Sequence, residues 1–376
     1  MNLSFSDEQE QLRDSVRQFL EAKSPSVDVR RLMDTEDGFD PGVWDQMSGE
    51  LQLQGLHIPE EFGGQGFTFV ELGIVLEEMG RALLCSPYFS TTVLAANAIL
   101  NAGTAEQCSE LLPGIASGNT IATLAFTEPN GSWEAAGIEL QARQARNAYV
   151  LDGCKSFVID GHLADLIIVA GRLEGTQGEH GISLFTVDGN ASGLSRTSLP
   201  TMDQTRKQAR FDFQEVQARP LGDLGRGWPC LARTLDQAAV ALSNEMVGGA
   251  QKVLEMSVDY AKTRVQFGRP IGSFQAIKHK CTDMLVEVEA AKSAAYYAAS
   301  IAADDTEELP LAASMAKAYC SDAYFHCAAE NIQIHGGLGF TWEHDAHLYF
   351  KRAKSSQLLF GDSTFHRELV AQYLEL

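Results

Sequence analysis

The stretch "AYVLDGCKSFVID", residues 148–160, decides the fold class. Its β-branched, aromatic and aliphatic residues are interrupted by Gly and Asp, a composition typical of β-strands. Similar short runs lie around it: "TIATLAFTE" (120–128), "DLIIVAGR" (165–172), "GISLFTV" (181–187) and "ARFDFQEV" (209–216). Because no helical pattern separates these runs, they predict an antiparallel sandwich or barrel rather than a doubly wound sheet.

Helical periodicity precedes and follows this β-rich region. "VELGIVLEEMGRALL" (70–84) places apolar residues on one stripe over an acidic opposite face, and the period returns in "LARTLDQAAVALSNEMVGGAQKVLEMSVDYAKTR" (231–264). The order predicts an α+β fold, mainly α. We expect an N-terminal helical domain over 1–118, a β-domain over 119–226 and a C-terminal helical domain over 227–376.

Composition narrows the function classes. The chain has 376 residues, of which 45% are hydrophobic, and no segment approaches the roughly 20 apolar residues of a membrane span. The net charge of -21 and the scattered basic residues argue against nucleic-acid binding. Early acidic residues on an amphipathic helix argue against a signal or transit peptide. Seven cysteines without metal or redox spacing indicate free thiols, so we expect a cytoplasmic protein.

Familiar catalytic motifs are missing from the sequence. It contains no His-Glu-x-x-His, P-loop or Gly-x-Ser-x-Gly, which removes the anchors of metalloprotease, NTPase and hydrolase-elbow interpretations. The glycines of "HGGLGF" (335–340) follow a helical run, whereas a dinucleotide fingerprint must follow a strand. Taken alone, this segment predicts a tight turn.

Several segments are specific when taken together. They are "LSFSDEQEQLRDSVRQFL" (3–20), "PEEFGGQGF" (59–67), "AFTEP" (125–129), "GCKSFVIDG" (153–161), "TRVQFGRPIGSFQA" (263–276) and "IQIHGGLGF" (332–340). In this order they resemble the acyl-CoA dehydrogenase family over essentially the whole chain. The resemblance implies a C-terminal four-helix bundle, FAD as cofactor and oxidation of an acyl-CoA substrate to the 2,3-enoyl-CoA. It also implies electron-transferring flavoprotein as acceptor and assembly as a dimer of dimers.

Matching positions in this resemblance supply the expected cofactor contacts. Those at the isoalloxazine or its phosphate are Phe126, Thr127 and Ser132, with Phe157 and Ile159 against the ring; those at a neighbouring subunit's FAD are Arg264, Gln266 and Phe267; the opposing wall is Gln333, Gly336 and Gly337. Taken singly, each aromatic residue is equally consistent with a core position and each polar residue with a structural one. The chain also departs from the family, because Phe157 and Ile159 stand where Trp and Thr are frequent, and Trp133 where a small Ser is usual.

The catalytic base is the main departure. "KRAKSSQLLFGDSTFHR" (351–367) aligns with the family's motif without a gap, and the usual catalytic glutamate falls on Phe360. A phenylalanine accepts no proton, so only the backbone N–H of Phe360 is expected to act, by polarising the thioester carbonyl. Asp362, two residues later, is expected to cap a helix or to contact the cofactor ribose.

A second family position for the glutamate also lacks an acid, because it falls on Ala238. Glu245, seven residues further on the same helix, shares the face of Ala238 about 10 Å along the axis. We consider Glu245 the candidate base, with a structural ion pair as the alternative. Asp236 would project about 160° away from the aligned position and is a weaker candidate.

Two functions remain open. The first is an FAD-dependent acyl-CoA dehydrogenase that works as a homotetramer. The second is a non-catalytic or half-site subunit of an α2β2 heterotetramer, similar to the smaller subunits of bacterial acyl-CoA dehydrogenases that act on steroid side chains. Less favoured alternatives are a non-oxidative reaction on an acyl thioester, such as elimination or desulfination, and a structural protein without flavin.

Overall fold

A computed structural model describes residues 5–145 and 148–376. The chain divides into two compact units. The first contains the described chain through Arg31, Phe69–Leu84 and Ala239–Leu376, and the second contains Leu32–Thr68 and Cys85–Ala238. Helix α7 (Gly227–Thr263) belongs to both. Among the described residues, no helix has the length and hydrophobicity needed to cross a membrane.

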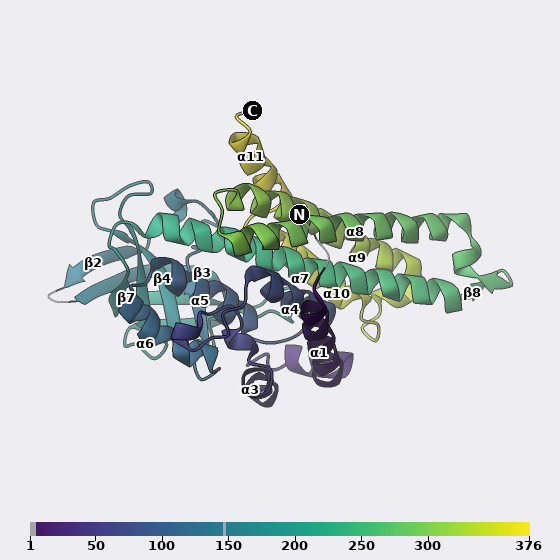
Figure 1. Ribbon diagram of the computed structural model, residues 1–376, viewed down its shortest axis with the longest axis horizontal. Helices are drawn as coiled ribbons and strands as arrows, with labels where there is room; N and C mark the ends of the chain where they lie inside the picture. The colour runs from purple at the N-terminus through teal and green to yellow at the C-terminus, as the bar shows by residue number, and fades with distance from the viewer. Residues whose placement is uncertain (1–4, 146–147) are drawn as a thin grey trace. The chain divides into compact units, whose positions relative to one another are not determined.

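The second unit is built on one seven-stranded sheet (Figure 1). Its strands are β1 (Ala122–Ala125), β2 (Gln141–Ala145), β3 (Ala148–Ile159), β4 (Leu166–Leu173), β5 (Ile182–Asp188), β6 (Leu194–Leu199) and β7 (Gln208–Leu221). The sheet closes on itself, because β4 pairs with both β2 and β5, while β3 and β7 join the other ends of the path. The predicted β-domain is confirmed, with parallel rather than antiparallel pairing of β4 with β1 and β2.

Apolar side chains on the inner face of the sheet form its core. Phe185, Phe211, Ile167 and Leu151 are fully buried there. The five predicted runs coincide with β1, β3, β4, β5 and β7. Strands β2 and β6 were not predicted, because β6 buries no residue and β2 buries only Ala142, which leaves no hydrophobic alternation to detect.

Short helices complete the second unit. They are α3 (Pro41–Gly49), η1 (Leu53–Gly55), η2 (Glu60–Phe62), η3 (Phe89–Ala95), α5 (Ala96–Ala102), α6 (Ala105–Ala116) and η4 (Ala135–Gly137). Helix α6 begins with a reciprocal capping box, in which Thr104 accepts from the Gln107 backbone and the Gln107 side chain accepts from the Thr104 backbone.

A buried histidine makes the stability of this unit dependent on pH. His57 Nε2 lies 3.1 Å from Asn97 Oδ1, and burial lowers the pKa of His57 from 6.5 to about 4. As the pH falls from 6.5 to 4, the unfolded chain binds a proton that the folded chain does not, so the free energy of unfolding falls, by at most about 3 kcal/mol. We predict that His57→Gln, which keeps a donor for Asn97 but does not titrate, flattens this dependence in urea unfolding followed from pH 7 to 4. An unchanged pH dependence in the variant would contradict the prediction, after the separate contribution of His366, whose pKa is also lowered to about 4, is accounted for.

Long helices form the first unit (Figure 1). They are α1 (Asp7–Lys23), α2 (Ser26–Met33), α4 (Phe69–Arg81), α8 (Gln275–Asp304), α9 (Leu309–His335), α10 (Ala346–Leu358) and α11 (Ser363–Tyr373), with short turns η5 (Ile271–Ser273) and η6 (Gly336–Phe340). Helix α9 packs against α8, α10 and α11. A hairpin of β8 (Val265–Gln266) and β9 (Arg269–Pro270) joins α7 to α8.

Glycines allow α4 and α7 to cross at close range. A methyl group at Gly248 would lie 1.7 Å from the carbonyl oxygen of Glu77, and one at Gly80 would lie 2.0 Å from the carbonyl oxygen of Glu245. Contacts this short are with backbone atoms, which cannot turn aside as a side chain can. The crossing therefore requires glycine at both positions.

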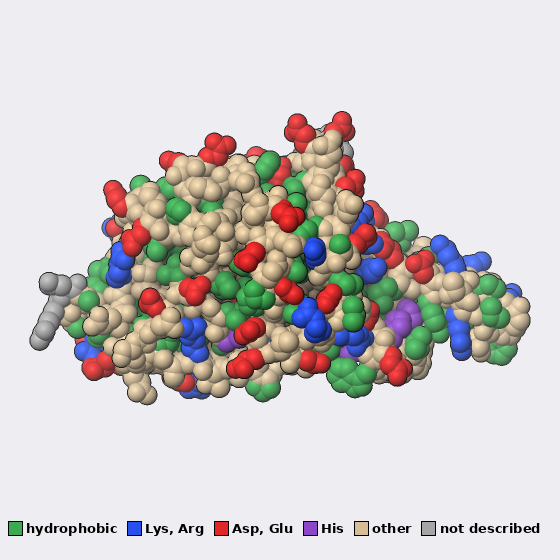
Figure 2. All heavy atoms as spheres, turned by 90° about the horizontal axis from the view of Figure 1, so that it is seen from below, with side chains coloured by type: hydrophobic (Ala, Val, Ile, Leu, Met, Phe, Trp, Pro, Cys, Tyr) green, Lys and Arg blue, Asp and Glu red, His purple; other side chains and the backbone are tan. Residues whose placement is uncertain are grey.

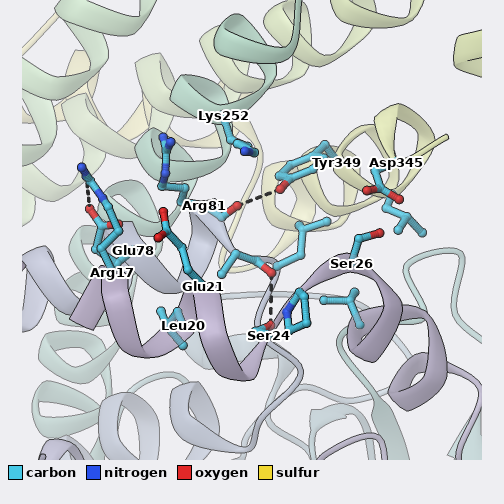
Figure 3. A pocket seen from close by; sticks show the side chains of 15 residues that line it. Arg17, Leu20, Glu21, Ser24, Ser26, Glu78, Arg81, Lys252, Asp345 and Tyr349 are labelled. Atoms are coloured by element: carbon cyan, nitrogen blue, oxygen red, sulfur yellow. Dashed lines mark hydrogen bonds and ion pairs between the residues drawn. The ribbon is translucent and has the colours of Figure 1, made fainter. Parts of the chain in front are cut away.

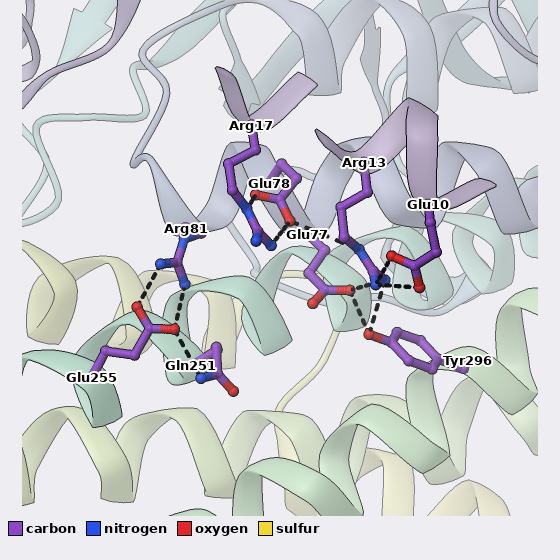
Figure 4. A network of polar contacts seen from close by, with 9 residues as sticks. All are labelled: Glu10, Arg13, Arg17, Glu77, Glu78, Arg81, Gln251, Glu255 and Tyr296. Carbon is purple, nitrogen blue, oxygen red and sulfur yellow. Dashed lines mark hydrogen bonds and ion pairs between the residues drawn. The ribbon is translucent and has the colours of Figure 1, made fainter. Parts of the chain in front are cut away.

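Charged side chains join α1, α4 and α7 beside this crossing (Figure 4). Arg17 of α1 makes a bidentate contact to Glu78 of α4, at 2.9 and 2.6 Å, and Arg81 of α4 contacts both carboxylate oxygens of Glu255 of α7. Burial raises the pKa of Glu77, against the opposing effects of Arg13 and of the hydrogen bond from Tyr296. The network orients the helices that frame the first unit.

Candidate cofactor and substrate site

A strained turn follows α10 at the position where the sequence places the missing base. Phe360 has φ +60° and is 5% exposed, and Gly361 has φ +101°. A bulky residue in the left-handed region is a genuine conformational outlier, and such strain clusters at functional sites. Asp362 caps α11, since its Oδ1 accepts a 2.8 Å hydrogen bond from Phe365 N. The structure thus gives Asp362 the capping role predicted for it, and its cofactor contact stays a prediction.

The two acids that the sequence singles out on α7 have different surroundings. Glu245 is buried, and its Oε1 lies 2.7 Å from Arg352 Nη1 of α10. Asp236 is half-buried, and burial raises its pKa to about 7, against the lowering effect of Arg233. Glu245 therefore neutralises a buried cation, whereas Asp236 has the acidity of a general base at neutral pH.

In the second unit, the end of β1 lies beside β3. Ser156 N donates to the Thr127 carbonyl at 2.9 Å, and Thr123 Oγ1 donates to the Ile159 carbonyl at 2.7 Å. Phe126 is buried, with its ring centroid 5.8 Å from that of Trp133. Four predicted positions, Phe126, Thr127, Phe157 and Ile159, are thus brought together by two neighbouring strands.

Phe157 lies where the pairing of β3 with β7 is irregular. Its φ is +60°, the register shifts between Lys155 and Val158, and 45% of the side chain is exposed. Bulges re-aim side chains, often next to active sites. The irregularity turns an aromatic ring outward, whereas the neighbouring predicted residue, Ile159, is buried.

Ser132 lies in a tight turn after this segment. Its N–H donates to Asn130 Oδ1 at 3.0 Å, and its hydroxyl oxygen accepts from Glu134 N at 3.2 Å. The hydroxyl hydrogen can still be donated to a ligand, because this contact uses only the oxygen as acceptor.

The hairpin between α7 and α8 presents the predicted contacts to a neighbouring subunit. Every residue from 262 to 270 is exposed, including Arg264 and Gln266, and 91% of the Phe267 side chain is accessible. Figure 2 shows Lys and Arg side chains gathered at the end of the first unit that carries β8, beside hydrophobic ones. An exposed guanidinium and an exposed aromatic ring are groups that suit phosphate and adenine.

The end of α9 provides an open, side-chain-free surface. Gln333, Gly336 and Gly337 are exposed, and a methyl group built at either glycine would meet no atom within 4 Å. Gly336 has φ +59°, which favours glycine at this position. Such a surface lets another molecule approach the backbone closely.

The predicted residues fit FAD by their chemistry. An outward-facing ring at Phe157 offers a flat contact for a flavin, Arg264 offers paired donors for phosphate, and the exposed glycines permit close approach. Their roles in binding remain predictions.

The sequence did not single out two buried lysines beside these segments. Lys155 donates to the Phe126 carbonyl at 3.0 Å and to Glu128 Oε1 at 2.7 Å, and Lys317 donates to carbonyls around the Phe360 turn. Burial lowers the pKa of Lys155 to about 8 and that of Lys317 to about 7. The available signal was a lone lysine within an apolar run, "GCKSFV" (153–158) or "ASMAKAYC" (313–320).

A cavity of about 260 Å³ in the first unit lies apart from the predicted residues (Figure 3). Its lining includes Arg17, Glu78, Arg81, Lys252 and Tyr349. The two guanidinium groups form ion pairs with acids of the protein, and the Tyr349 hydroxyl donates to the Arg81 carbonyl at 2.7 Å. None of the predicted site residues lines it, so the cavity marks a junction of helices rather than the predicted site.

Comparison with known proteins covers the whole chain. Models of the acyl-CoA dehydrogenase N-terminal, middle and C-terminal domains match residues 6–119, 123–216 and 225–375. The chain is 34% identical over 372 residues to acyl-CoA dehydrogenase IpdE2 of Mycobacterium tuberculosis (strain ATCC 25618 / H37Rv), covering 98% of each chain.

Solved structures give the same result. Butyryl-CoA dehydrogenase from Megasphaera elsdenii superimposes with a TM-score of 0.93 at 27% identity, covering 100% of both chains. A chain of the ChsE4-ChsE5 complex from Mycobacterium tuberculosis gives 0.89 at 25% identity, covering 100% of this chain and 99% of that one. The chain therefore belongs to the acyl-CoA dehydrogenase family of FAD-dependent oxidoreductases.

Proposed function

We propose that this chain oxidises an acyl-CoA thioester to the 2,3-enoyl-CoA, with the backbone N–H of Phe360 polarising the thioester carbonyl. The turn at Phe360 carries the proposal, because it keeps a strained, buried backbone at the family's catalytic position without its carboxylate. A backbone donor does not depend on side-chain identity, and removing one such donor typically costs about 10²- to 10³-fold in kcat.

The remaining predicted residues bind and orient. FAD, when bound, supplies the hydride acceptor. Phe126, Thr127, Phe157 and Ile159 form the flavin side of the site, with Ser132 donating its hydroxyl to the cofactor. Arg264, Gln266 and Phe267 reach a neighbouring subunit's FAD, and Gln333, Gly336, Gly337 and Asp362 complete the cofactor contacts.

A half-site role is the second candidate function, and the surroundings of Glu245 favour it. Neither aligned position carries an acid, and Glu245 is engaged with Arg352 in a buried ion pair. In this case the chain pairs with a related, base-bearing subunit in an α2β2 heterotetramer. The similarity to a chain of the two-component ChsE4-ChsE5 complex supports this arrangement. A homotetramer is expected if this chain acts alone.

The context of the reaction follows from the family. We propose electron-transferring flavoprotein as the acceptor, a fatty acyl or steroid side-chain thioester as the substrate, and the cytoplasm as the location. The similarity to IpdE2 and to the ChsE4-ChsE5 complex supports the larger acyl groups.

The visible spectrum of the purified chain tests both candidates. For the first function we expect yellow protein whose flavin absorbance bleaches when acyl-CoA thioesters of several sizes are added without oxygen. For the second we expect bleaching only after co-expression with a related, base-bearing subunit. Protein that binds no flavin in either preparation would overturn both. In the active preparation, Glu245→Gln and Asp236→Asn distinguish the acids, because loss of bleaching with flavin retained identifies a base.

A further inference from the structure

The turn that carries Phe360 is held from outside by two buried basic side chains. Nothing within residues 359–361 favours φ +60° for a phenylalanine, so the conformation persists only if its surroundings impose it. Hydrogen bonds to three carbonyl oxygens of the segment, those of Gln357, Phe360 and Gly361, supply this constraint.

Lys317 of α9 holds two of these carbonyls. Its ammonium lies 2.8 Å from the Gly361 carbonyl, 3.1 Å from the Gln357 carbonyl and 3.1 Å from Ser321 Oγ, and the side chain is fully buried. Three N–H donors thus meet three acceptors, which is the full capacity of a lysine. The end of α10 and the far side of the turn are tied to one atom.

His366 of α11 holds the third carbonyl. Its Nε2 lies 3.0 Å from the Phe360 carbonyl oxygen, and its Nδ1 lies 3.3 Å from Ser314 Oγ of α9. Burial lowers the pKa of His366 to about 4, so the imidazole is neutral near pH 7. Because the carbonyl can only accept, the single ring proton lies on Nε2, and Nδ1 accepts from the Ser314 hydroxyl.

We propose that Lys317 and His366 are positioning residues, which fix the backbone on both sides of residue 360 so that its N–H points at the thioester carbonyl oxygen. The inference rests on the proposed function, because it assigns to these side chains the geometry that the reaction requires. Neither contacts the substrate. They act through carbonyls at residues 357, 360 and 361, so their loss lets the turn relax and the N–H move away from the developing negative charge.

The binding of a 3-oxoacyl-CoA separates positioning from general stability. This ligand has an acidic C2 proton that it loses to solvent, so its enolate forms without a base from the protein. An N–H that donates to the thioester oxygen stabilises the enolate and lowers the ligand's apparent pKa when it is bound. The measurement is a pH titration of the enolate and charge-transfer absorbance, made on the FAD-loaded assembly and, if needed, with its related subunit.

Four variants and one control define the experiment. Lys317→Met and His366→Leu remove the donors, whereas Lys317→Gln and His366→Gln keep one N–H in place. Tyr349→Phe is the control, because it removes a buried hydrogen bond at the opposite end of α10 without touching the turn. Hydrogen–deuterium exchange of residues 355–362 reports on the turn itself, independently of flavin.

We expect Lys317→Met and His366→Leu to weaken enolate stabilisation about 10- to 100-fold and to lower kcat similarly, while KM changes less than about threefold. Exchange in residues 355–362 should rise, the His366→Gln variant should recover most of the effect, and Tyr349→Phe should match the wild type. Unchanged enolate titration in folded Lys317→Met and His366→Leu, or equal effects in Tyr349→Phe, would overturn the inference. Failure of the wild type to bind FAD or the ligand would instead overturn the proposed function.

Discussion

Replacing Arg352 by Met is expected to lower the free energy of unfolding of the first unit by about 3 to 5 kcal/mol. Arg352 and Glu245 are 4% and 5% exposed, and their charged atoms lie 2.7 Å apart. Removing the guanidinium leaves the carboxylate buried beside the α4–α7 crossing without its counter-charge. Urea unfolding monitored by circular dichroism measures the change.

The double variant Glu245→Leu/Arg352→Met is expected to recover most of this loss. Replacing a buried ion pair by apolar residues of similar volume is often neutral or stabilising, because neither charge then has to be desolvated. Arg219→Met is the matched control. It breaks an exposed pair with Glu110, whose side chains are 68% and 50% accessible, and should cost less than about 1 kcal/mol.

The same pair of variants decides the role of Glu245. We expect the double variant to keep substrate-dependent flavin reduction in the active assembly, since the ion pair gives Glu245 a structural role. A double variant that is as stable as the wild type but reduces flavin 10²- to 10⁴-fold more slowly would contradict this, and would identify Glu245 as the base. A double variant as unstable as Arg352→Met would show that the site tolerates no apolar replacement.

Much of the architecture could be predicted because it depends on local patterns. Period-3.6 stripes located the helices, and apolar runs located five strands with buried faces. Strand β6, "LSRTSL" (194–199), has no buried side chain, so no pattern distinguishes it from a loop. The parallel pairing of β1 with β4 depends on how distant segments meet, which short-range periodicity does not contain.

The candidate site divides along the same line. Phe360 and Asp362 could be placed because they occupy positions in a contiguous motif. The partner of Glu245 is Arg352, 107 residues away along the chain, and the carbonyls held by Lys317 lie 40 and 44 residues from it. A lysine surrounded by alanines indicates burial or exposure equally well until its acceptors are known, which is why both buried lysines were missed.

Lys155→Met is expected to destabilise the second unit by about 3 to 5 kcal/mol and to weaken FAD binding at least about tenfold. Lys155 is fully buried, and its ammonium joins the Phe126 carbonyl to Glu128 Oε1. The substitution leaves Glu128 without its cation and frees the segment that carries Phe126 and Thr127. Urea unfolding measures the first effect, and titration of flavin absorbance measures the second.

A second substitution separates the two effects, and it differs from the apolar exchange suited to Arg352. Glu128 Oε1 also accepts from the backbone N–H groups of Glu139 and Leu140, at 2.9 Å each, so an apolar replacement would leave two buried donors unpaired. Glu128→Gln removes the charge and keeps the acceptor. In Lys155→Met/Glu128→Gln we therefore expect at least half of the stability to return, while the Phe126 carbonyl still lacks its donor and FAD binding stays weak. Recovery of both would mean that Lys155 only balances charge. Recovery of neither would mean that its donation to Phe126 also maintains the fold of the strand end.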